Sequence, residues 1–198
     1  RILLEYVPSG QEYLKPIVEA MKENRVLNMT YHSYWRDEEN NFDILPYCVK
    51  LFRQRWYLVG CSTYSYYQEK GPRIYALDRI HSLHETDETF IMPKDWEAQE
   101  FFDGCFGIIA DQRMDIQTIK LKVNASQANY IRDLELHESQ KEIERNGEYS
   151  IFTYQLRPSY DFIQELLWNG ADMEVLEPQS LRQEIANIVE QLHKKYKK

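Results

Sequence analysis

Apolar residues recur at two different spacings in the first 85 residues of the chain. In residues 11–24 they lie three or four positions apart, which is the period of a helix with one buried face. From residue 27 the period is two, as in half-buried strands, over residues 27–35, 42–51, 55–62, 73–77 and 80–85. The pattern predicts an amphipathic helix followed by five short strands that form a small curled sheet or barrel.

The spacing of the apolar residues changes again after residue 115. Strand and helix periods alternate over residues 116–123, 126–134, 136–143, 149–156, 158–169, 173–176 and 178–195. Asn146-Gly147 favours a tight hairpin turn, and Gly170 favours the end of a helix. The order β-α-β-β-α-β-α predicts a ferredoxin-like unit with an extra C-terminal helix, so the fold class of the whole chain is α+β.

These patterns divide the chain into four parts. Residues 1–10 end in Pro-Ser-Gly and are predicted to be a linker remnant, and residues 11–86 form the helix and barrel. Residues 87–114 are a connector, and residues 115–198 form the ferredoxin-like unit. The connector contains more large apolar residues than a free linker carries, so we expect it to run over a surface of this chain or of another subunit.

Composition narrows the class of protein. No apolar run approaches the roughly 20 residues that a membrane span needs, and no secretory signal is present, so we expect no membrane partner. Cys48, Cys61 and Cys105 have no C-x-x-C spacing and indicate reduced thiols in a cytoplasmic protein. The formal net charge of −8 opposes binding of duplex DNA by the overall field of this chain. A small anion or a short oligonucleotide at a local positive surface stays compatible with it.

Such a local surface is present in residues 50–79. This stretch contains six basic residues and two acidic ones, whereas residues 80–111 contain one basic and eight acidic residues. The strands here are rich in tyrosine and tryptophan. Guanidinium groups bind phosphate through two parallel hydrogen bonds, and aromatic faces stack nucleobases at about 1–3 kcal/mol each. The stretch therefore has the residue types that a nucleotide ligand requires.

The same stretch carries a resemblance to a known family. RWYLVG at residues 55–60 and RIYALDRI at residues 73–80 resemble the signature of the WYL domain. The spacing to Pro-Tyr at residues 46–47 and to Phe-x-x-Pro at residues 90–93 is similar as well. GADMEVLEP at residues 170–178, followed by a long helix, is similar to the WYL C-terminal extension.

The resemblance implies a bacterial transcriptional regulator. In that family an N-terminal winged helix-turn-helix binds duplex DNA, and the WYL domain is an Sm-like, SH3-like β-barrel that senses a ligand. The C-terminal extension helps to build a homodimer, and the ligands are nucleotide-like molecules or nucleic acids, including short single-stranded DNA. This chain contains no helix-turn-helix, and its start at Arg1 fits removal of that domain. Contact with duplex DNA is therefore expected only through the missing domain.

Arg73 and Arg79 are the leading predicted ligand contacts, and the family motif points to the same two residues. Arg79 has an alternative, which is an ion pair with Asp78 or with an acid of the connector. Trp56 and Tyr57 lie on opposite faces of one strand, so they do not both face a ligand. We expect Trp56 to be the core residue of the two and Tyr57 to be a ligand contact.

Further predicted ligand contacts lie on the first strand and around the turn after the second. Tyr31, His32 and Tyr34 are candidates on the first strand, although His32 is equally explained as a hydrogen-bonded structural histidine. The remaining predicted positions are phosphate contacts at Lys50, Arg53 and Arg55, with Trp56, Leu58 and Asp78 as structural positions of the motif. Solvated turn charges explain the three basic residues equally well.

Catalysis has little support in this sequence. It contains neither G-x-x-x-x-G-K-[ST] nor G-x-S-x-G. His81 and His84 have an H-x-x-H spacing, but a strand end does not place both imidazoles on one face. We therefore expect no enzyme activity, no cofactor and no metal. The alternative to a ligand sensor is a structural or protein-interaction module, with the connector as its partner surface.

Overall fold

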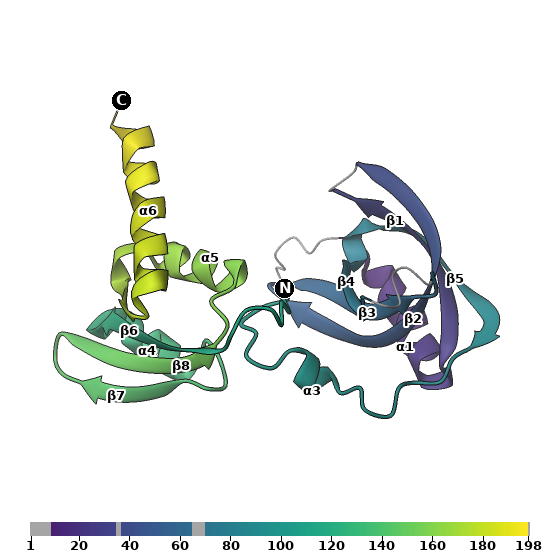
Figure 1. Cartoon of the computed structure of the whole chain (residues 1–198), viewed down its shortest axis with the longest axis horizontal. Helices are drawn as coiled ribbons and strands as arrows, with labels where there is room; N and C mark the ends of the chain where they lie inside the picture. Colours follow the sequence, from purple (N-terminus) through teal and green to yellow (C-terminus); the bar gives the residue numbers. More distant parts are fainter. Residues whose placement is uncertain (1–8, 35–36, 65–69, 198) are drawn as a thin grey trace, which may run out of the picture. The chain divides into compact units, whose positions relative to one another are not determined.

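The computed structural model describes residues 9–34, 37–64 and 70–197 (Figure 1). The chain divides into two units, Arg1–Phe101 and Phe102–Lys198. In the described part of the chain, none of the helices has the length and apolar character needed to cross a membrane.

Among its described residues, the N-terminal unit contains two helices, one of them short, and five strands. A short 3₁₀ turn, η1 (Gln11–Tyr13), leads into α1 (Leu14–Glu23), and a short helix, α3 (Ala98–Phe101), ends the unit. The strands and the 3₁₀ turn between the last two are β1 (Arg25–Ser33), β2 (Glu38–Phe52), β3 (Arg55–Ser62), β4 (Arg73–Ala76), η2 (Leu77–Arg79) and β5 (Ile80–Thr89). The predicted helix followed by five strands is therefore present.

The five strands form one antiparallel sheet in the order β4-β3-β2-β1-β5. The predicted closed barrel is not found, because the described residues show no ladder between the edge strands β4 and β5. The sheet nevertheless curls far enough for the three residues of η2 to join its two edges. The chain leaves the extended conformation at Leu77, before the outer edge of β4 can align with β5.

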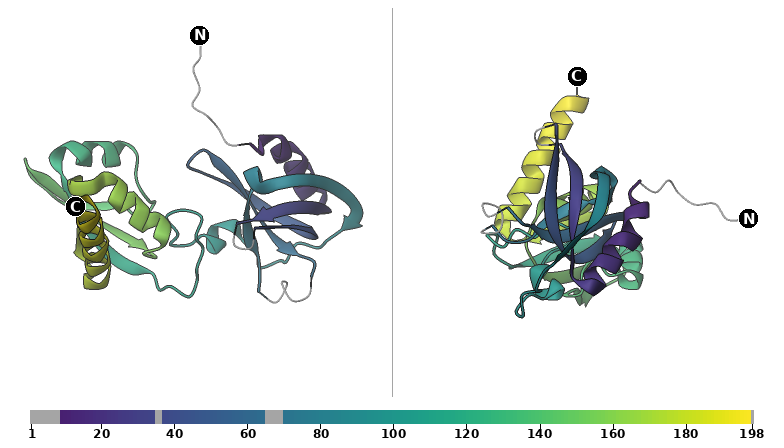
Figure 2. Two further views of the ribbon diagram at one scale, coloured as in Figure 1. Left: turned by 90° about the horizontal axis from the view of Figure 1, so that it is seen from above. Right: turned by 90° about the vertical axis from the view of Figure 1, so that its right-hand side faces the viewer.

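The core of this unit lies between α1 and the sheet (Figure 2). Ile17 and Ala20 of α1 are fully buried, and Leu27 and Met29 of β1 meet them from the period-two face that the sequence predicts. Apolar burial on this scale contributes about 1.5–3 kcal/mol per large side chain, which holds α1 on the sheet.

The chain enters this unit directly against η2. Gly10 has φ +98°, a left-handed conformation that favours glycine. A Cβ atom at this position would lie 2.4 Å from the carbonyl carbon of Leu77. Only a residue without a side chain allows the backbone at position 10 to approach the backbone of η2 this closely.

Two aromatic residues that follow β5 cover part of β2. The rings of Phe90 and Trp96 lie 6.0 and 5.0 Å from the ring of Tyr47, measured between centroids. The amide of Phe90 also donates a hydrogen bond to the carbonyl of Asn24. This part of the expected connector is therefore attached to the N-terminal unit.

The C-terminal unit has the predicted order of elements. They are β6 (Gln117–Asn124), α4 (Ala125–Asp133), β7 (Lys141–Arg145), β8 (Tyr149–Leu156), α5 (Tyr160–Asn169), η3 (Gly170–Asp172), β9 (Met173–Glu177) and α6 (Gln179–Tyr196). The strands form an antiparallel sheet in the order β7-β8-β6-β9. Alternate residues of the central strands β6 and β8 point to α4 and α5 and form the core: Ile119, Leu121, Val123, Phe152, Tyr154 and Leu156.

Local signals in the sequence account for several boundaries of this unit. The side chain of Asn124 accepts a hydrogen bond from the amide of Gln127 and caps α4. Asn146 accepts hydrogen bonds from two amides of the β7–β8 turn, which the Asn-Gly pair predicts. Strand β7, by contrast, begins five residues later than residue 136. The reason is Gln140, which bonds to the amide of Leu136 and the carbonyl of Ile131 and holds this segment as a loop.

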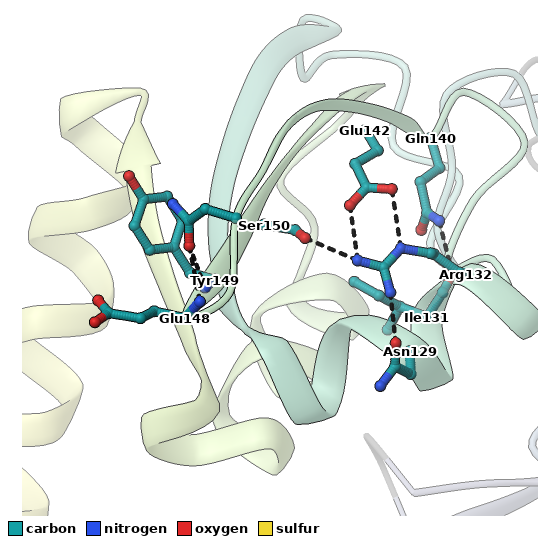
Figure 3. A network of polar contacts seen from close by, with 9 residues as sticks. Asn129, Ile131, Arg132, Gln140, Glu142, Glu148, Tyr149 and Ser150 are labelled. Carbon is teal, nitrogen blue, oxygen red and sulfur yellow. Dashed lines mark hydrogen bonds and ion pairs between the residues drawn. The ribbon is translucent and has the colours of Figure 1, made fainter.

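Arg132 links α4 to the edge strand β7 (Figure 3). Its guanidinium donates to both carboxylate oxygens of Glu142 at 2.9 and 2.8 Å, to Ser150 Oγ at 2.8 Å and to Asn129 Oδ1 at 2.7 Å. These hydrogen bonds from Arg132 are the main reason that the pKa of Glu142 is lowered to about 2. The contact attaches the outermost strand of the sheet to the helical layer.

Candidate functional site

Three elements of the N-terminal unit meet at η2. The end of β1, the start of β3 and the first turn η1 all contact this short helical segment. They bring together Tyr31 and Tyr34 from β1 and the residue that follows it, Arg55 from β3, and Asp78 and Arg79 from η2. These five residues are all positions that the sequence marks as functional or as part of the motif.

Arg79 is the central residue of this group. Its guanidinium carbon lies 4.4 Å from the centroid of the Tyr34 ring, in the geometry of a cation–π contact. Tyr34 is 66% exposed, so the ring is open to solvent beside the arginine. Within the described residues, the buried Nε of Arg79 has no hydrogen-bond acceptor. A buried N–H without an acceptor is costly, and the oxygen of an anionic ligand would satisfy it.

Asp78 does not pair with its neighbour Arg79. Its carboxylate is 10% exposed and lies 3.2 Å from Nε of Arg55, which forms the ion pair instead. Consecutive residues of a 3₁₀ turn point about 120° apart, which sends the two side chains of η2 in different directions. The one carboxylate on η2 thus forms its ion pair with Arg55, although its buried Oδ1 accepts no hydrogen bond among the described residues.

Tyr31 lies in the core rather than on the surface. It is 8% exposed, and its ring packs edge-on against Tyr75 with centroids 5.2 Å apart. Its hydroxyl oxygen accepts a hydrogen bond from the amide of Ala76 at 3.3 Å. Burial is the main cause that raises the pKa of this hydroxyl. In this position the hydroxyl of Tyr31 holds the backbone at Ala76, the last residue of β4 before η2.

His32 occupies the other face of β1. Its Nε2 lies 3.0 Å from Asp37 Oδ1, and its ring meets Tyr34 edge-on. The ring also stacks on His81 with centroids 5.7 Å apart, and His81 Nδ1 lies 2.6 Å from Glu39 Oε1. One imidazole–carboxylate pair thus lies beside Tyr34, and a second one stacks on the first through His81.

Sequence reasoning missed the second of these pairs. It considered His81 only together with His84 as a metal ligand, and it did not consider Glu39. The available signal was the position of His81 immediately after the motif, because β5 begins at Ile80 and pairs with β1 there. In the described part of the chain, no three or more His, Cys, Asp and Glu side chains gather as a metal site would require.

Arg73 lies at the other end of β4 from η2. It is exposed and pairs in register with Gly60 of β3. The four-residue strand puts its Cα roughly 10 Å from that of Ala76. The structure therefore does not bring the two leading arginines into one contact, and a ligand that touches both must extend along β4.

The other predicted positions surround this region at different depths. Lys50 of β2 is opposite Tyr57 of β3 in the sheet, and Tyr57 is only 7% exposed. Arg53 lies in the turn between β2 and β3, with its guanidinium 5.3 Å from the Phe52 ring centroid. Trp56 is partly buried against the core cluster that contains the fully buried Leu58.

Comparison with known proteins covers both units. The model of the WYL domain matches residues 12–85, and the model of the WCX domain matches residues 115–192. Comparison with the curated proteins gave no match.

Two of the solved structures that resemble the chain are a CRISPR Cas-related protein and a proteasome accessory factor. A CRISPR Cas-related protein is 14% identical with a TM-score of 0.53, over 93% of this chain and 52% of that chain. Proteasome accessory factor B/C (PafBC) of Arthrobacter aurescens is 20% identical with a TM-score of 0.38, over 99% of this chain and 29% of that chain. The chain thus spans about half of the first protein and less than a third of the second. The two domain matches identify it: the chain belongs to the WYL-domain family and carries a WCX domain after its WYL domain.

Proposed function

We propose that this chain is the ligand-sensing and dimerisation region of a bacterial WYL-type transcriptional regulator. Its effector is a nucleotide or a short single-stranded nucleic acid, and it binds where Arg79, Tyr34 and His32 meet beside η2. Binding there controls a DNA-binding domain that lies outside this chain, in the bacterial cytoplasm. We call this group of three residues the Arg79 surface.

The observation that carries the proposal is the state of Arg79. A partly buried guanidinium has one N–H without an acceptor in the described chain and covers one face of an exposed tyrosine. A phosphate oxygen supplies the missing acceptor, and the exposed part of Tyr34 offers a stacking surface for a base. Arg79 therefore offers a partner for the phosphate of a nucleotide, and the adjacent Tyr34 offers one for its base.

The charges around the Arg79 surface support an anionic ligand. Asp78 is occupied by Arg55, and Asp37 and Glu39 face the rings of His32 and His81. None of these carboxylates forms an ion pair with Arg79 among the described residues. An incoming phosphate therefore does not have to displace an internal partner of Arg79. Such a displacement would reduce the affinity of the phosphate for the protein.

An effector controls another domain only if it binds two states of the protein with different affinity. Arg79 and Tyr34 come from different elements, η2 and the end of β1. A ligand held by both fixes the position of η2 relative to β1. The proposed signal is this change in η2.

The direct test is titration of the purified chain with labelled single-stranded oligonucleotides of two to ten nucleotides and with cyclic nucleotides. Arg79→Ala and Arg73→Ala are compared with Arg113→Ala, which removes an exposed arginine from a loop of the C-terminal unit. We expect Arg79→Ala to weaken the best ligand at least tenfold and Arg113→Ala to leave it unchanged. If neither Arg79→Ala nor Arg73→Ala changes any affinity, the assigned surface is wrong.

A further inference from the structure

Four planar side chains form a continuous row that begins in the Arg79 surface and ends on β5. The guanidinium of Arg79 covers the Tyr34 ring, which meets the His32 ring edge-on with centroids 5.6 Å apart. The His32 ring in turn stacks on His81, with centroids 5.7 Å apart and the ring planes at 24° to each other. His81 therefore continues the Arg79 surface, although the proposed function assigns no role to it.

Each imidazole of this row contacts a carboxylate with one of its two ring nitrogens. Nε2 of His32 lies 3.0 Å from Asp37 Oδ1, and Nδ1 of His81 lies 2.6 Å from Glu39 Oε1. An ionised carboxylate only accepts hydrogen bonds, so these two nitrogens carry the proton when the rings are neutral. The hydrogen bond thereby fixes the tautomer of each ring.

The second nitrogen of each ring decides how the row meets an anion. Nδ1 of His32 and Nε2 of His81 have no hydrogen-bond partner among the described residues. In a neutral ring this nitrogen presents a lone pair, which repels a phosphate oxygen. In a protonated ring it is an N–H donor on a positive group, which attracts the same oxygen. Protonation therefore converts this end of the row into a phosphate contact.

The surroundings of the two rings favour one added proton over two. Each ring has its own carboxylate, which stabilises a positive charge on that ring. Two charged rings with centroids 5.7 Å apart would repel each other, however, so the second proton is opposed by the first. The titratable and charged groups around the rings are Tyr34, Asp37, Glu39, Arg79 and Tyr13, whose hydroxyl donates to the carbonyl of His81.

We propose that His81 and His32 are one further phosphate contact of the effector and that the phosphate binds there together with a proton. The phosphate oxygen accepts a hydrogen bond from the second nitrogen of one ring, and that ring takes its proton from solvent. Asp37 or Glu39 stabilises the resulting cation from the other nitrogen. This inference rests on the proposed function and deepens it, because the protonated protein binds the effector more tightly and the affinity rises as the pH falls.

The first test measures the affinity of the whole chain for a labelled oligothymidylate of six nucleotides without a terminal phosphate, at pH 5.5 and 7.5. Neither thymine nor an internal phosphodiester changes its charge in this range, so a proton taken up on binding goes to the protein. An imidazole in water is mostly protonated at the lower pH and mostly neutral at the higher one, so we expect an affinity at least about fivefold higher at pH 5.5. Calorimetry in buffers of different ionisation enthalpy should show uptake of about one proton per ligand.

Variants of the two rings separate a ligand contact from a structural role. The double variant His32→Gln/His81→Gln removes both protonation sites, and we expect weak binding at both pH values. His81→Lys supplies a permanent positive charge and should bind tightly at both. His193→Gln removes a histidine of α6 as the matched control and should keep the wild-type difference. The His81 side chain is 48% exposed, and circular dichroism checks that every variant remains folded.

Failure of this inference is distinguishable from failure of the sensing proposal. Binding that Arg79→Ala weakens but that is equally tight at both pH values overturns the proton-coupled contact and leaves the sensing proposal standing. A pH dependence that the double variant retains also overturns the contact. Equal losses in His81→Lys and in the double variant would show that the rings only connect β1, β2 and β5. If the chain binds none of the oligonucleotides or cyclic nucleotides at either pH, the sensing proposal fails and this inference fails with it.

Discussion

Two arginines in this chain show opposite ways of using the same side chain. Arg132 of the WCX domain donates to Glu142, Ser150 and Asn129, and its guanidinium is held on three sides (Figure 3). Arg79 of the WYL domain lies over a tyrosine ring, with its buried Nε lacking an acceptor among the described residues. The first arrangement spends the hydrogen-bonding capacity of an arginine on the fold. The second leaves part of that capacity unused within the described chain, and we propose that a ligand uses it.

The largest expected effect separates these two roles by stability. Arg132→Ala leaves Glu142 and the buried Ser150 without their donor, and we expect a loss of about 1–3 kcal/mol in the free energy of unfolding. Arg79→Ala removes a group with an unsatisfied N–H, so its stability should change by less than about 0.5 kcal/mol. Urea denaturation of both variants measures the difference. Equal losses in the two variants would show that Arg79 is as structural as Arg132.

The free energy of unfolding at acidic pH gives a second test of the structural role of Arg132. Arg132 lowers the pKa of Glu142 to about 2, below the ordinary value of 4.5. A lowered pKa in the folded state means that this contribution is complete above pH 4.5 and is lost as the pH falls towards 2. Glu142→Gln cannot titrate, so the stability of this variant should fall less steeply between pH 4.5 and 2. Denaturation at four or five pH values tests this, and parallel curves for wild type and variant would contradict it.

The smallest expected effect concerns the ring beside Arg79. Arg79 already covers one face of Tyr34, so only the remaining surface is available to a base. Tyr34→Ala should therefore weaken oligonucleotide binding by about 1 kcal/mol, or roughly fivefold, at the low end for base stacking. Tyr34→Phe keeps the ring and should bind almost as wild type. Fluorescence anisotropy of a labelled oligonucleotide distinguishes the two variants, and an equal loss in both would point to the hydroxyl instead.

Much of the fold could be predicted because its signals are local. Periods of two and 3.6, the Asn146-Gly147 turn and the Asn124 cap each depend on residues close in sequence. Closure of the sheet is different, because it depends on whether the edges β4 and β5 align in space. The late start of β7 was missed for a similar reason, since the two bonds of Gln140 compete with strand formation in a way that hydrophobic period does not show.

The candidate site was predictable in its residue types but not in its pairings. Sequence adjacency made Asp78 the natural partner of Arg79, whereas η2 directs it to Arg55. The period-two pattern already placed Tyr31 on the face of Leu27 and Met29, and its burial follows from that pattern more than from its polar hydroxyl. The partners of His81 depend on the register of β5 against β1, and its position immediately after the motif is the one signal in the sequence that points to this place.

Gly10 couples the entry of the chain into the WYL domain to the position of η2. Because no side chain separates its backbone from Leu77, the incoming chain and η2 are in direct contact and have little room to move independently. If the proposed ligand displaces η2, the backbone at position 10 would therefore have to move with it. A methyl group at this position would clash with the backbone of Leu77 and force the two backbones apart. Gly10→Ala would then alter how the proposed signal leaves η2, although every residue of the Arg79 surface is unchanged.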